Sequence, residues 1–316
     1  MNTTTASHHV TGLHHITAIS SDVKRNVRFY TEVLGLRFVK KSVNQDDTGT
    51  YHLYYGNYTG APGTALTFFP WAGLARGRPG RGQAYATAFS VPAASLPFWQ
   101  ERLTRLNVAV FPIEERYGDQ VLPFFDHDGL RLELVATAEN DPRPPTPSTV
   151  IPAEHAIRGF HSSTLALNDA GPTAAVLTGQ MGYRQVGEGS YRTRFTAGDG
   201  GPGTYVDLLV DPSVPRGLNG AGTIHHVAFR VPDDATQVAA RSVLQENALM
   251  VSPVIDRAYF KSIYYREPGG VLFEIATDQP GFAIDEPVET LGTKLSLPPH
   301  LEPHRAEIEA GLPKIN

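Results

Sequence analysis

The sequence predicts an α+β fold in which four βαβββ units form two cup-shaped mixed β-sheets with the helices outside. The 316 residues exceed one ordinary small core and suit two domains of roughly 100 to 200 residues each, or one duplicated domain. An alternating apolar strand, an amphipathic helix and several extended segments then recur four times in the same order. Hydrophobic residues make up 41% of the chain and charged residues 19%, which is the profile of a soluble globular protein.

The first unit opens with the strand LHHITAIS, residues 13–20. A helix is expected from Asp22 to Leu34, because Asp22 is a favourable N-cap and Gly35 a favourable C-cap. Three extended segments follow as strands: RFVKKSV, YHLYYGN and TALTFFP. The order of one strand, one helix and three strands defines the repeating unit.

The second unit repeats this order and begins with the strand AYATAFSVP, residues 84–92. Its helix is expected near residues 94–106, and it ends with PFFDHDGLRLELVA, where Asp128-Gly129 is a hairpin turn signal. The segment ENDPRPPTPSTVIP, residues 139–152, is rich in proline and suits an extended linker between domains. The first two units are therefore expected to form an N-terminal domain over residues 8–138.

The third and fourth units are expected to form a second domain over residues 153–278. The third opens with GFHSSTLAL, has a helix near residues 171–181 and closes with TYVDLLVDP. The fourth opens with TIHHVAFRVP, has a helix near residues 234–247 and closes with SIYYREPGGVLFEIATD, whose glycine pair makes a turn. The tail, residues 279–316, is punctuated by proline and has one short helical stretch around residues 303–310.

Charge and composition exclude several classes of function. The formal net charge is −5, without the basic excess of a nucleic-acid binder, so no nucleic-acid partner is expected. No segment approaches the ~18 consecutive apolar residues of a membrane helix, and the N-terminus lacks the features of a signal peptide. We therefore expect no membrane partner and a cytoplasmic location. With 12 histidines and no cysteine, any metal must be held by nitrogen and oxygen ligands.

Two histidine doublets stand in strands that otherwise look half-buried: His14-His15 in the first unit and His225-His226 in the fourth. Successive side chains of a strand point to opposite faces of the sheet. His225 shares its parity with the apolar Val227, so it is expected to face the helix side, as is His14. His15 and His226 are then the equivalent residues on the open face of the cup.

The closing strand of the fourth unit adds a carboxylate to that open face. Phe273 and Ile275 lie on its apolar side, which leaves Glu274 on the opposite one. A carboxylate amid apolar neighbours is costly unless it is paired or ligates a metal. Glu274 is therefore a candidate ligand.

The equivalent positions of the other units lack a complete ligand set. The histidine position is occupied by Ala86 in the second unit and Ser162 in the third, and alignment puts Phe68 of the first unit at the Glu274 position. Two carboxylates and one histidine at such positions are interpreted as structural remnants of the duplication: Glu133, Asp207 and His161. Only one complete metal site is therefore expected.

The candidate metal ligands are His15, His226 and Glu274. Two neutral imidazoles and one carboxylate are the facial set of non-haem iron(II) oxygenases, which leaves about three positions open for substrate and oxygen. A glyoxalase-type isomerase usually fills four positions with protein ligands, and Phe68 removes the natural fourth. The set favours Fe²⁺ over zinc or nickel, and Mn²⁺ can occupy the same ligands. Units one and four are expected to share one cup, because the ligands come from both.

A set of motifs extends over nearly the whole chain: LHHIT, GLRFVKKSVN, YHLYYGN, PGTALTFFP, EHAIRGFHS, IHHVAF and EPGGVLFEIAT. They resemble the vicinal oxygen chelate superfamily, which includes extradiol ring-cleaving dioxygenases, glyoxalases and bleomycin-resistance proteins. Within it, the chain is most similar to the hydroquinone-type ring-cleaving dioxygenases, such as 2,6-dichlorohydroquinone dioxygenase and the methylhydroquinone-responsive enzymes. The resemblance implies an Fe²⁺-dependent enzyme that inserts O₂ into a hydroquinone or related aromatic diol, and a homo-oligomer is expected.

The resemblance also implies roles for residues beside the ligands. Arg257 in DRAYF is expected to stabilise the developing anion, and Tyr264 in SIYYRE to act as a positioned acid. Further residues are expected in the substrate pocket or behind the ligands: His14, Thr17 and His225. The chain departs from the family where EPGG replaces the commoner threonine before proline and where Ala258 precedes a tyrosine. These departures affect the expected substrate preference more than the reaction type.

Two other functions stay open from the sequence. A catechol-type extradiol dioxygenase uses the same metal ligands, so only substrate assays separate it from a hydroquinone enzyme. A metal-free protein of the same fold that sequesters an aromatic compound would hold no iron. In that case His226→Ala would leave the affinity for the aromatic ligand intact.

Overall fold

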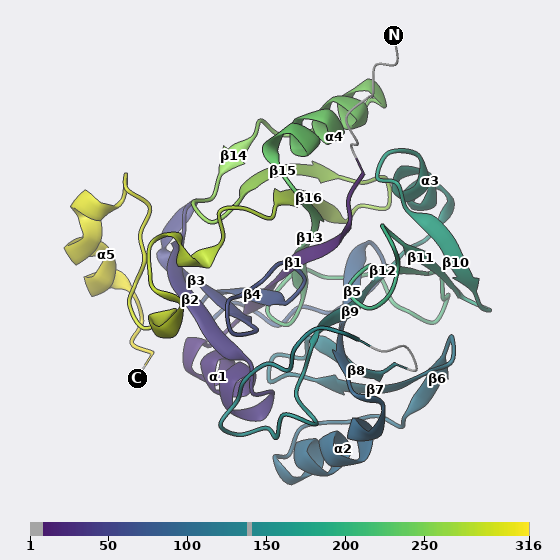
Figure 1. Cartoon of the computed structure of the whole chain (residues 1–316), viewed down its shortest axis with the longest axis horizontal. Coiled ribbons are helices and arrows are strands. Elements are labelled where there is room, and N and C mark those ends of the chain that lie inside the picture. The colour runs from purple at the N-terminus through teal and green to yellow at the C-terminus, as the bar shows by residue number, and fades with distance from the viewer. Residues whose placement is uncertain (1–8, 138–140, 316) are drawn as a thin grey trace.

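The computed structural model describes residues 9–137 and 141–315, and within them sixteen strands form two curled mixed sheets of eight strands each (Figure 1). Four βαβββ units follow one another in the predicted order, which confirms the predicted fold class. Units one and four form the first sheet, and units two and three form the second. The pairing of units that the candidate ligands require is therefore observed.

The first sheet has the strand order β14-β15-β16-β13-β1-β4-β3-β2. Its strands are β1 (Gly12–Ser20), β2 (Arg37–Asn44), β3 (Asp47–Gly56), β4 (Ala65–Pro70), β13 (Ile224–Val231), β14 (Ile255–Asp256), β15 (Lys261–Arg266) and β16 (Leu272–Thr277). At its centre β1 and β13 run antiparallel, and each has a parallel neighbour on its other side, β4 and β16. The three candidate ligands therefore come from three adjacent strands: β1, β13 and β16.

The second sheet repeats this arrangement in the order β10-β11-β12-β9-β5-β8-β7-β6. Its strands are β5 (Gln83–Val91), β6 (Glu114–Arg116), β7 (Asp119–Phe125), β8 (Arg131–Ala136), β9 (Gly159–Ala166), β10 (Arg184–Glu188), β11 (Arg192–Thr196) and β12 (Tyr205–Leu209). The segment between β8 and β9 contains the predicted linker. The predicted start of the first domain at residue 8 and its boundary with the linker at residues 138–139 lie outside the described residues.

One α-helix of each unit lies outside the sheets: α1 (Val23–Arg28), α2 (Leu96–Arg105), α3 (Gly171–Gly179) and α4 (Asp234–Glu246) (Figure 1). Asp22 caps α1 as predicted, because its carboxylate accepts the backbone N–H groups of Lys24 and Arg25. The α-helix is shorter than predicted since the chain continues as a π-helix, η1 (Phe29–Val33), before Gly35 ends the segment with a φ of +69°. No described helix has the length and apolar character of a membrane span.

Apolar side chains of both sheets and of the helices pack into one main hydrophobic core. The rings of Phe229 on β13 and Phe273 on β16 meet there at 4.8 Å, and both side chains are completely buried. Burial of each such side chain contributes ~1.5–3 kcal/mol. The core fixes one face of these strands, so the alternate side chains, including Glu274, are directed to the concave face.

Two β-bulges change the directions predicted for the first histidine of each doublet. In the pairing of β1 with β13, His14 near one end and His225 near the other have no paired residue on the opposite strand. A bulge adds one residue to a strand and redirects its side chain. Strict alternation predicted that His225 faces the helices together with Val227, and this is wrong, because His225 is exposed and lines the cavity of the first sheet. His14 is buried and lies against His15.

The C-terminal tail lies beside β2 and β3 at the edge of the first sheet (Figure 1). It contains the short helices η3 (Phe282–Ile284), η4 (Val288–Thr290) and η5 (Glu302–His304), and α5 (Arg305–Gly311), so the helical stretch predicted near residues 303–310 is confirmed. Lys40 of β2 is completely buried, and its ammonium donates to Asp285 at 2.7 Å and Glu286 at 3.0 Å. These ion pairs attach the tail to the sheet, since a buried ammonium needs partners.

Candidate metal centre

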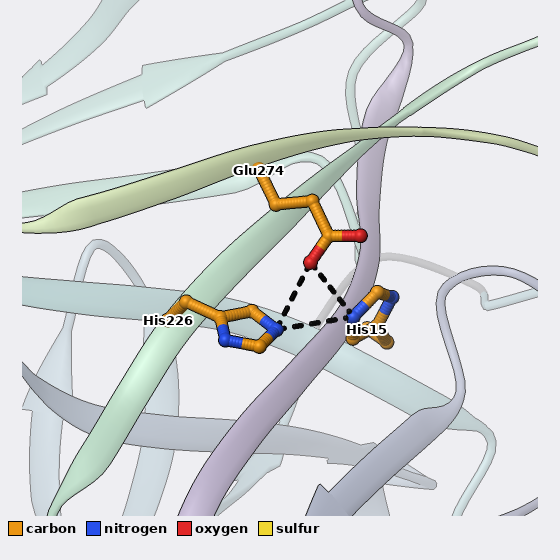
Figure 2. A group of neighbouring side chains, drawn as sticks. All are labelled: His15, His226 and Glu274. Carbon is orange, nitrogen blue, oxygen red and sulfur yellow. Dashed lines mark hydrogen bonds and ion pairs between the residues drawn. The ribbon is translucent and has the colours of Figure 1, made fainter. Parts of the chain in front are cut away.

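His15 on β1, His226 on β13 and Glu274 on β16 converge on the concave face of the first sheet (Figure 2). Glu274 Oε2 lies 3.0 Å from His226 Nε2 and 3.3 Å from His15 Nε2, and the two Nε2 atoms are 3.3 Å apart. All three side chains are buried, with relative exposures of 2%, 5% and 0%. The three residues that the sequence nominated are therefore brought together at one point.

The first histidine of a doublet orients the second. His14 Nε2 lies 3.1 Å from the carbonyl oxygen of Thr277, which can only accept, so this nitrogen carries the proton. His14 Nδ1 is then an acceptor, and His15 Nδ1–H donates to it at 2.8 Å. The Nε2 lone pair of His15 is left facing the centre. Such a hydrogen bond fixes both the tautomer and the ring orientation of a metal ligand.

The second doublet repeats this contact. His225 Nδ1 lies 2.8 Å from His226 Nδ1, and donation from His226 leaves its Nε2 free to face the centre. Burial, above all, lowers the pKa of His226, so its ring is neutral at ordinary pH. The adjacent histidines in both strands are therefore explained as one inward ring and one supporting ring.

Glu274 is held as a buried carboxylate. Ser262 donates to Oε1, while Oε2 has no hydrogen-bond partner although it faces both Nε2 atoms. Two nitrogen lone pairs and one carboxylate oxygen that meet without intervening protons repel one another. A divalent cation between them removes the repulsion, so the residues fit a metal ion.

The register of β4 changes the residue assigned to the fourth ligand position. Glu274 is paired with Ala228, two residues after His226, and the equivalent partner of Thr17, two residues after His15, is Thr67. The assignment of Phe68 to this position is therefore wrong, and Phe68 is buried in the main core. The first unit was expected to supply no fourth ligand, and this expectation does not change, because a threonine hydroxyl is not a ligand of the histidine or carboxylate type.

A cavity of about 470 Å³ is lined by two of the three ligands, His15 and His226. Phe69, Phe260 and Leu272 supply apolar wall, and the Phe260 ring lies 4.9 Å from that of His15. Arg257 and Tyr264 also line it, and Arg257 Nε donates to the Tyr264 hydroxyl at 3.1 Å. The cavity therefore offers an aromatic slot with polar groups beside the ligands.

The remaining site residues predicted from the sequence lie around this cavity in different ways. Tyr264 is paired with Glu274 across the sheet, and its ring lies 5.9 Å from that of His226. Thr17 is completely buried and its hydroxyl lies 2.7 Å from that of Thr67, so it contacts the wall and not the cavity. His225 lines the cavity. Each predicted residue is thus near the ligands, and its role stays a proposal.

Sequence reasoning gave no role to one histidine that lines the cavity. His52 on β3 lies between Thr67, at 2.9 Å from Nε2, and Tyr54, at 2.7 Å from Nδ1. The alternation of YHLYYGN could have found both residues, since it puts His52 and Tyr54 on one face and Leu53 on the other. The core contains Leu53, which leaves the cavity face to the other two.

The second sheet has carboxylates at the Glu274 position but holds them differently. Arg116 donates to Glu133 at 2.8 Å and Arg194 to Asp207 at 2.8 Å. Guanidinium groups thus neutralise these carboxylates, consistent with their interpretation as structural residues. Within residues 9–137 and 141–315, only the group in the first sheet brings three possible ligand atoms together.

Comparisons with known proteins agree with this architecture. Residues 12–134 and 92–275 match the family model of the Glyoxalase/Bleomycin resistance protein/Dioxygenase superfamily. A Bacillus subtilis (strain 168) protein named as a ring-cleaving dioxygenase, MhqO, is 48% identical over 302 residues, which cover 95% of each chain. The chlorohydroquinone/hydroquinone 1,2-dioxygenase of Sphingobium indicum is 36% identical over 308 residues, again 95% of each chain.

Solved structures of other proteins share this fold. A crystal structure of a Bacillus subtilis protein described as a dioxygenase has a TM-score of 0.92 at 44% identity and covers 98% of each chain. Glyoxalase I from Zea mays has a TM-score of 0.63 at 15% identity, covering 90% of this chain and 97% of its own, and this likeness concerns the fold alone. On the family match and these relatives, the chain belongs to the Glyoxalase/Bleomycin resistance protein/Dioxygenase superfamily.

Proposed function

We propose that the protein is an Fe²⁺-dependent ring-cleaving dioxygenase that inserts O₂ into a hydroquinone or a related aromatic diol. The observation that carries the proposal is the meeting of two buried imidazole nitrogens and one buried carboxylate oxygen, with no fourth histidine or carboxylate ligand among the residues that the structure describes. This set leaves about three coordination positions free. Relatives named as ring-cleaving and hydroquinone dioxygenases support the reaction and the substrate class.

His15, His226 and Glu274 would hold the metal. When bound, the ion supplies a Lewis acid for the substrate hydroxyl and a redox centre for O₂. Metal binding needs neutral histidine ligands and an ionised carboxylate, and burial lowers the pKa of His226, which keeps its ring neutral. His14 and His225 hold the ligand rings in place through their Nδ1 atoms.

Tyr264 and Arg257 would act on the substrate. Arg257 donates to the Tyr264 oxygen, so the phenolic proton is free to be donated into the cavity. Burial raises the pKa of Tyr264, and the phenol therefore keeps its proton at working pH. We assign Tyr264 the role of a positioned acid and Arg257 that of stabilising negative charge on the substrate. Full ring-cleaving turnover by Tyr264→Phe at unchanged iron content would contradict the acid role.

The cavity suits a planar aromatic ring. Phe69, Trp71 and Phe260 line it, and aromatic side chains pack against another ring in stacked or edge-on geometry. Apolar walls also exclude water, which strengthens the interactions of the polar groups with the substrate. The ring is thereby held next to the ligands with its hydroxyl groups available.

The test is anaerobic purification followed by loading with Fe²⁺ or Mn²⁺, metal analysis, and oxygen consumption on matched hydroquinones and catechols. We expect uptake with Fe²⁺ and hydroquinones and a ring-opened product. Uptake with catechols alone would place the protein among the catechol-type extradiol enzymes. No uptake by an iron-loaded sample on any diol would contradict the proposal. Failure to bind metal, with aromatic affinity kept in His226→Ala, would favour a metal-free binding protein.

A further inference from the structure

A second polar pair faces the cavity from the first unit. His52 and Tyr54 on β3 line the cavity, whereas Leu53 and Tyr55 point into the main core. The Tyr54 hydroxyl lies 2.7 Å from His52 Nδ1, and Tyr54 is only 4% exposed. The contact with His52 satisfies this buried hydroxyl, and Tyr54 still lines the cavity.

Tyr54 is the counterpart of Tyr264 in the duplicated architecture. Tyr54 is paired with Thr67 on β4 as Tyr264 is paired with Glu274 on β16. His52 holds Thr67 through Nε2 at 2.9 Å. The two tyrosines therefore approach the cavity from opposite halves of the sheet, one beside a metal ligand and the other beside a neutral hydroxyl.

Whichever nitrogen of His52 carries the proton, the Tyr54 hydroxyl can make one further hydrogen bond. Burial, above all, holds the pKa of His52 well below its ordinary value, so the ring is neutral. If the proton is on Nδ1, it is donated to the Tyr54 oxygen and the phenolic hydrogen remains free. If it is on Nε2, it is donated to Thr67, and the Tyr54 oxygen keeps its lone pairs. Tyr54 can thus donate to or accept from a hydroxyl.

The distance of Tyr54 from the ligand strand β1 determines which oxygen of the substrate it can contact. β3 is separated from β1 by β4, and two interstrand spacings amount to about 10 Å. Both oxygens of an ortho-diol lie at the same end of the ring. The second oxygen of a para-diol lies at the opposite end, and the aromatic side chains Phe69 and Phe260 line the intervening cavity.

We propose that Tyr54 is a specificity-determining residue, whose hydroxyl binds the distal hydroxyl of a para-diol while the other hydroxyl faces His15, His226 and Glu274. His52 is the positioning residue that holds the Tyr54 hydroxyl. The inference rests on the proposed function and narrows it, because it assigns the cavity to 1,4-diols in preference to 1,2-diols.

The test compares two ligands that differ only in the distal hydroxyl. Binding of hydroquinone and of phenol to metal-loaded protein is measured by anaerobic calorimetry. We expect the wild type to prefer hydroquinone. Tyr54→Phe should weaken hydroquinone binding about tenfold, which corresponds to about 1.4 kcal/mol, and should leave phenol binding unchanged. Tyr55→Phe is the matched control, since it removes a hydroxyl that donates to Asn26 on the core side of the same strand and should leave the preference intact.

Three results would overturn the assignment: no wild-type preference for hydroquinone, an unchanged preference in Tyr54→Phe, or equal weakening of both ligands. If Tyr54→Phe does not fold, the His52→Leu variant is measured instead. It releases the Tyr54 hydroxyl and should lower the preference for hydroquinone over phenol. An unchanged preference would reject the inference. Since affinity is measured without oxygen, absent turnover would count against the proposed function alone.

Discussion

Substitution of His14 by leucine tests how the histidine doublets hold the metal. His15 Nδ1–H donates to His14 at 2.8 Å, and His14 donates in turn to Thr277 at 3.1 Å. His14 is only 4% exposed and lies beside Phe260, so a leucine is accommodated there. The leucine leaves the Nδ1–H group of His15 without its acceptor. Loss of such a supporting partner weakens metal binding by about 10- to 100-fold, or about 1.4 to 2.7 kcal/mol.

The assay is Fe²⁺ or Mn²⁺ titration by anaerobic calorimetry, with the urea unfolding midpoint measured in parallel. His161→Leu is the matched control, because His161 occupies the equivalent bulge of the second sheet and is completely buried away from the three ligands. Both variants should lose stability, while only His14→Leu should lose metal affinity. Affinity within about twofold of the wild type, or an equal loss in His161→Leu, would refute the reasoning.

Three further predictions concern the ligands and their protonation. Glu274→Gln replaces a charged ligand by a neutral amide, so bound iron after desalting should fall further than in His14→Leu, and wild-type iron content would contradict this. Thr67→Glu places a carboxylate at the position of the first unit that is equivalent to Glu274. Metal should be retained while oxygen consumption falls, because the carboxylate fills an open coordination position. Undiminished oxygen consumption would contradict the assignment of Thr67 to that position. Acid should destabilise the metal-free protein, because burial lowers the pKa values of His14, His52 and His226 below the ordinary 6.5 and the unfolded chain then binds more protons. The free energy of unfolding should fall below about pH 6.5 by up to about 1.4 kcal/mol per pH unit for each ring, and a urea midpoint that does not fall between about pH 7.5 and about pH 5.5 would contradict the sign.

The repeat made the fold predictable from the sequence. Each unit carries its own alternating strand, helix signals and closing strand, and the four units support one another's interpretation. The pairing of units one and four followed from chemistry, since His15 and Glu274 must meet for either to be explained. Local patterns and the ligand set pointed to the same architecture, which is the consistency expected of a foldable sequence.

Register and bulges account for what the sequence could not predict. Displacement by one residue moves a strand side chain to the other face, so the alignment that chose Phe68 missed Thr67. The bulges at His14 and His225 depend on the partner strand, and no single-strand pattern reports them. The alternation of YHLYYGN places His52 on the concave face, but only the pairing of the strands brings it to the hydroxyls of Tyr54 and Thr67.

The central claim is that His15, His226 and Glu274 support insertion of O₂ into an aromatic ring. The most direct measurement is mass spectrometry of the product formed from a hydroquinone and ¹⁸O₂ by the iron-loaded protein. We expect a ring-opened product that carries both atoms of one oxygen molecule, and no such product from the Glu274→Gln variant. A quinone without ¹⁸O, or a ring-opened product labelled only from water, would contradict the claim.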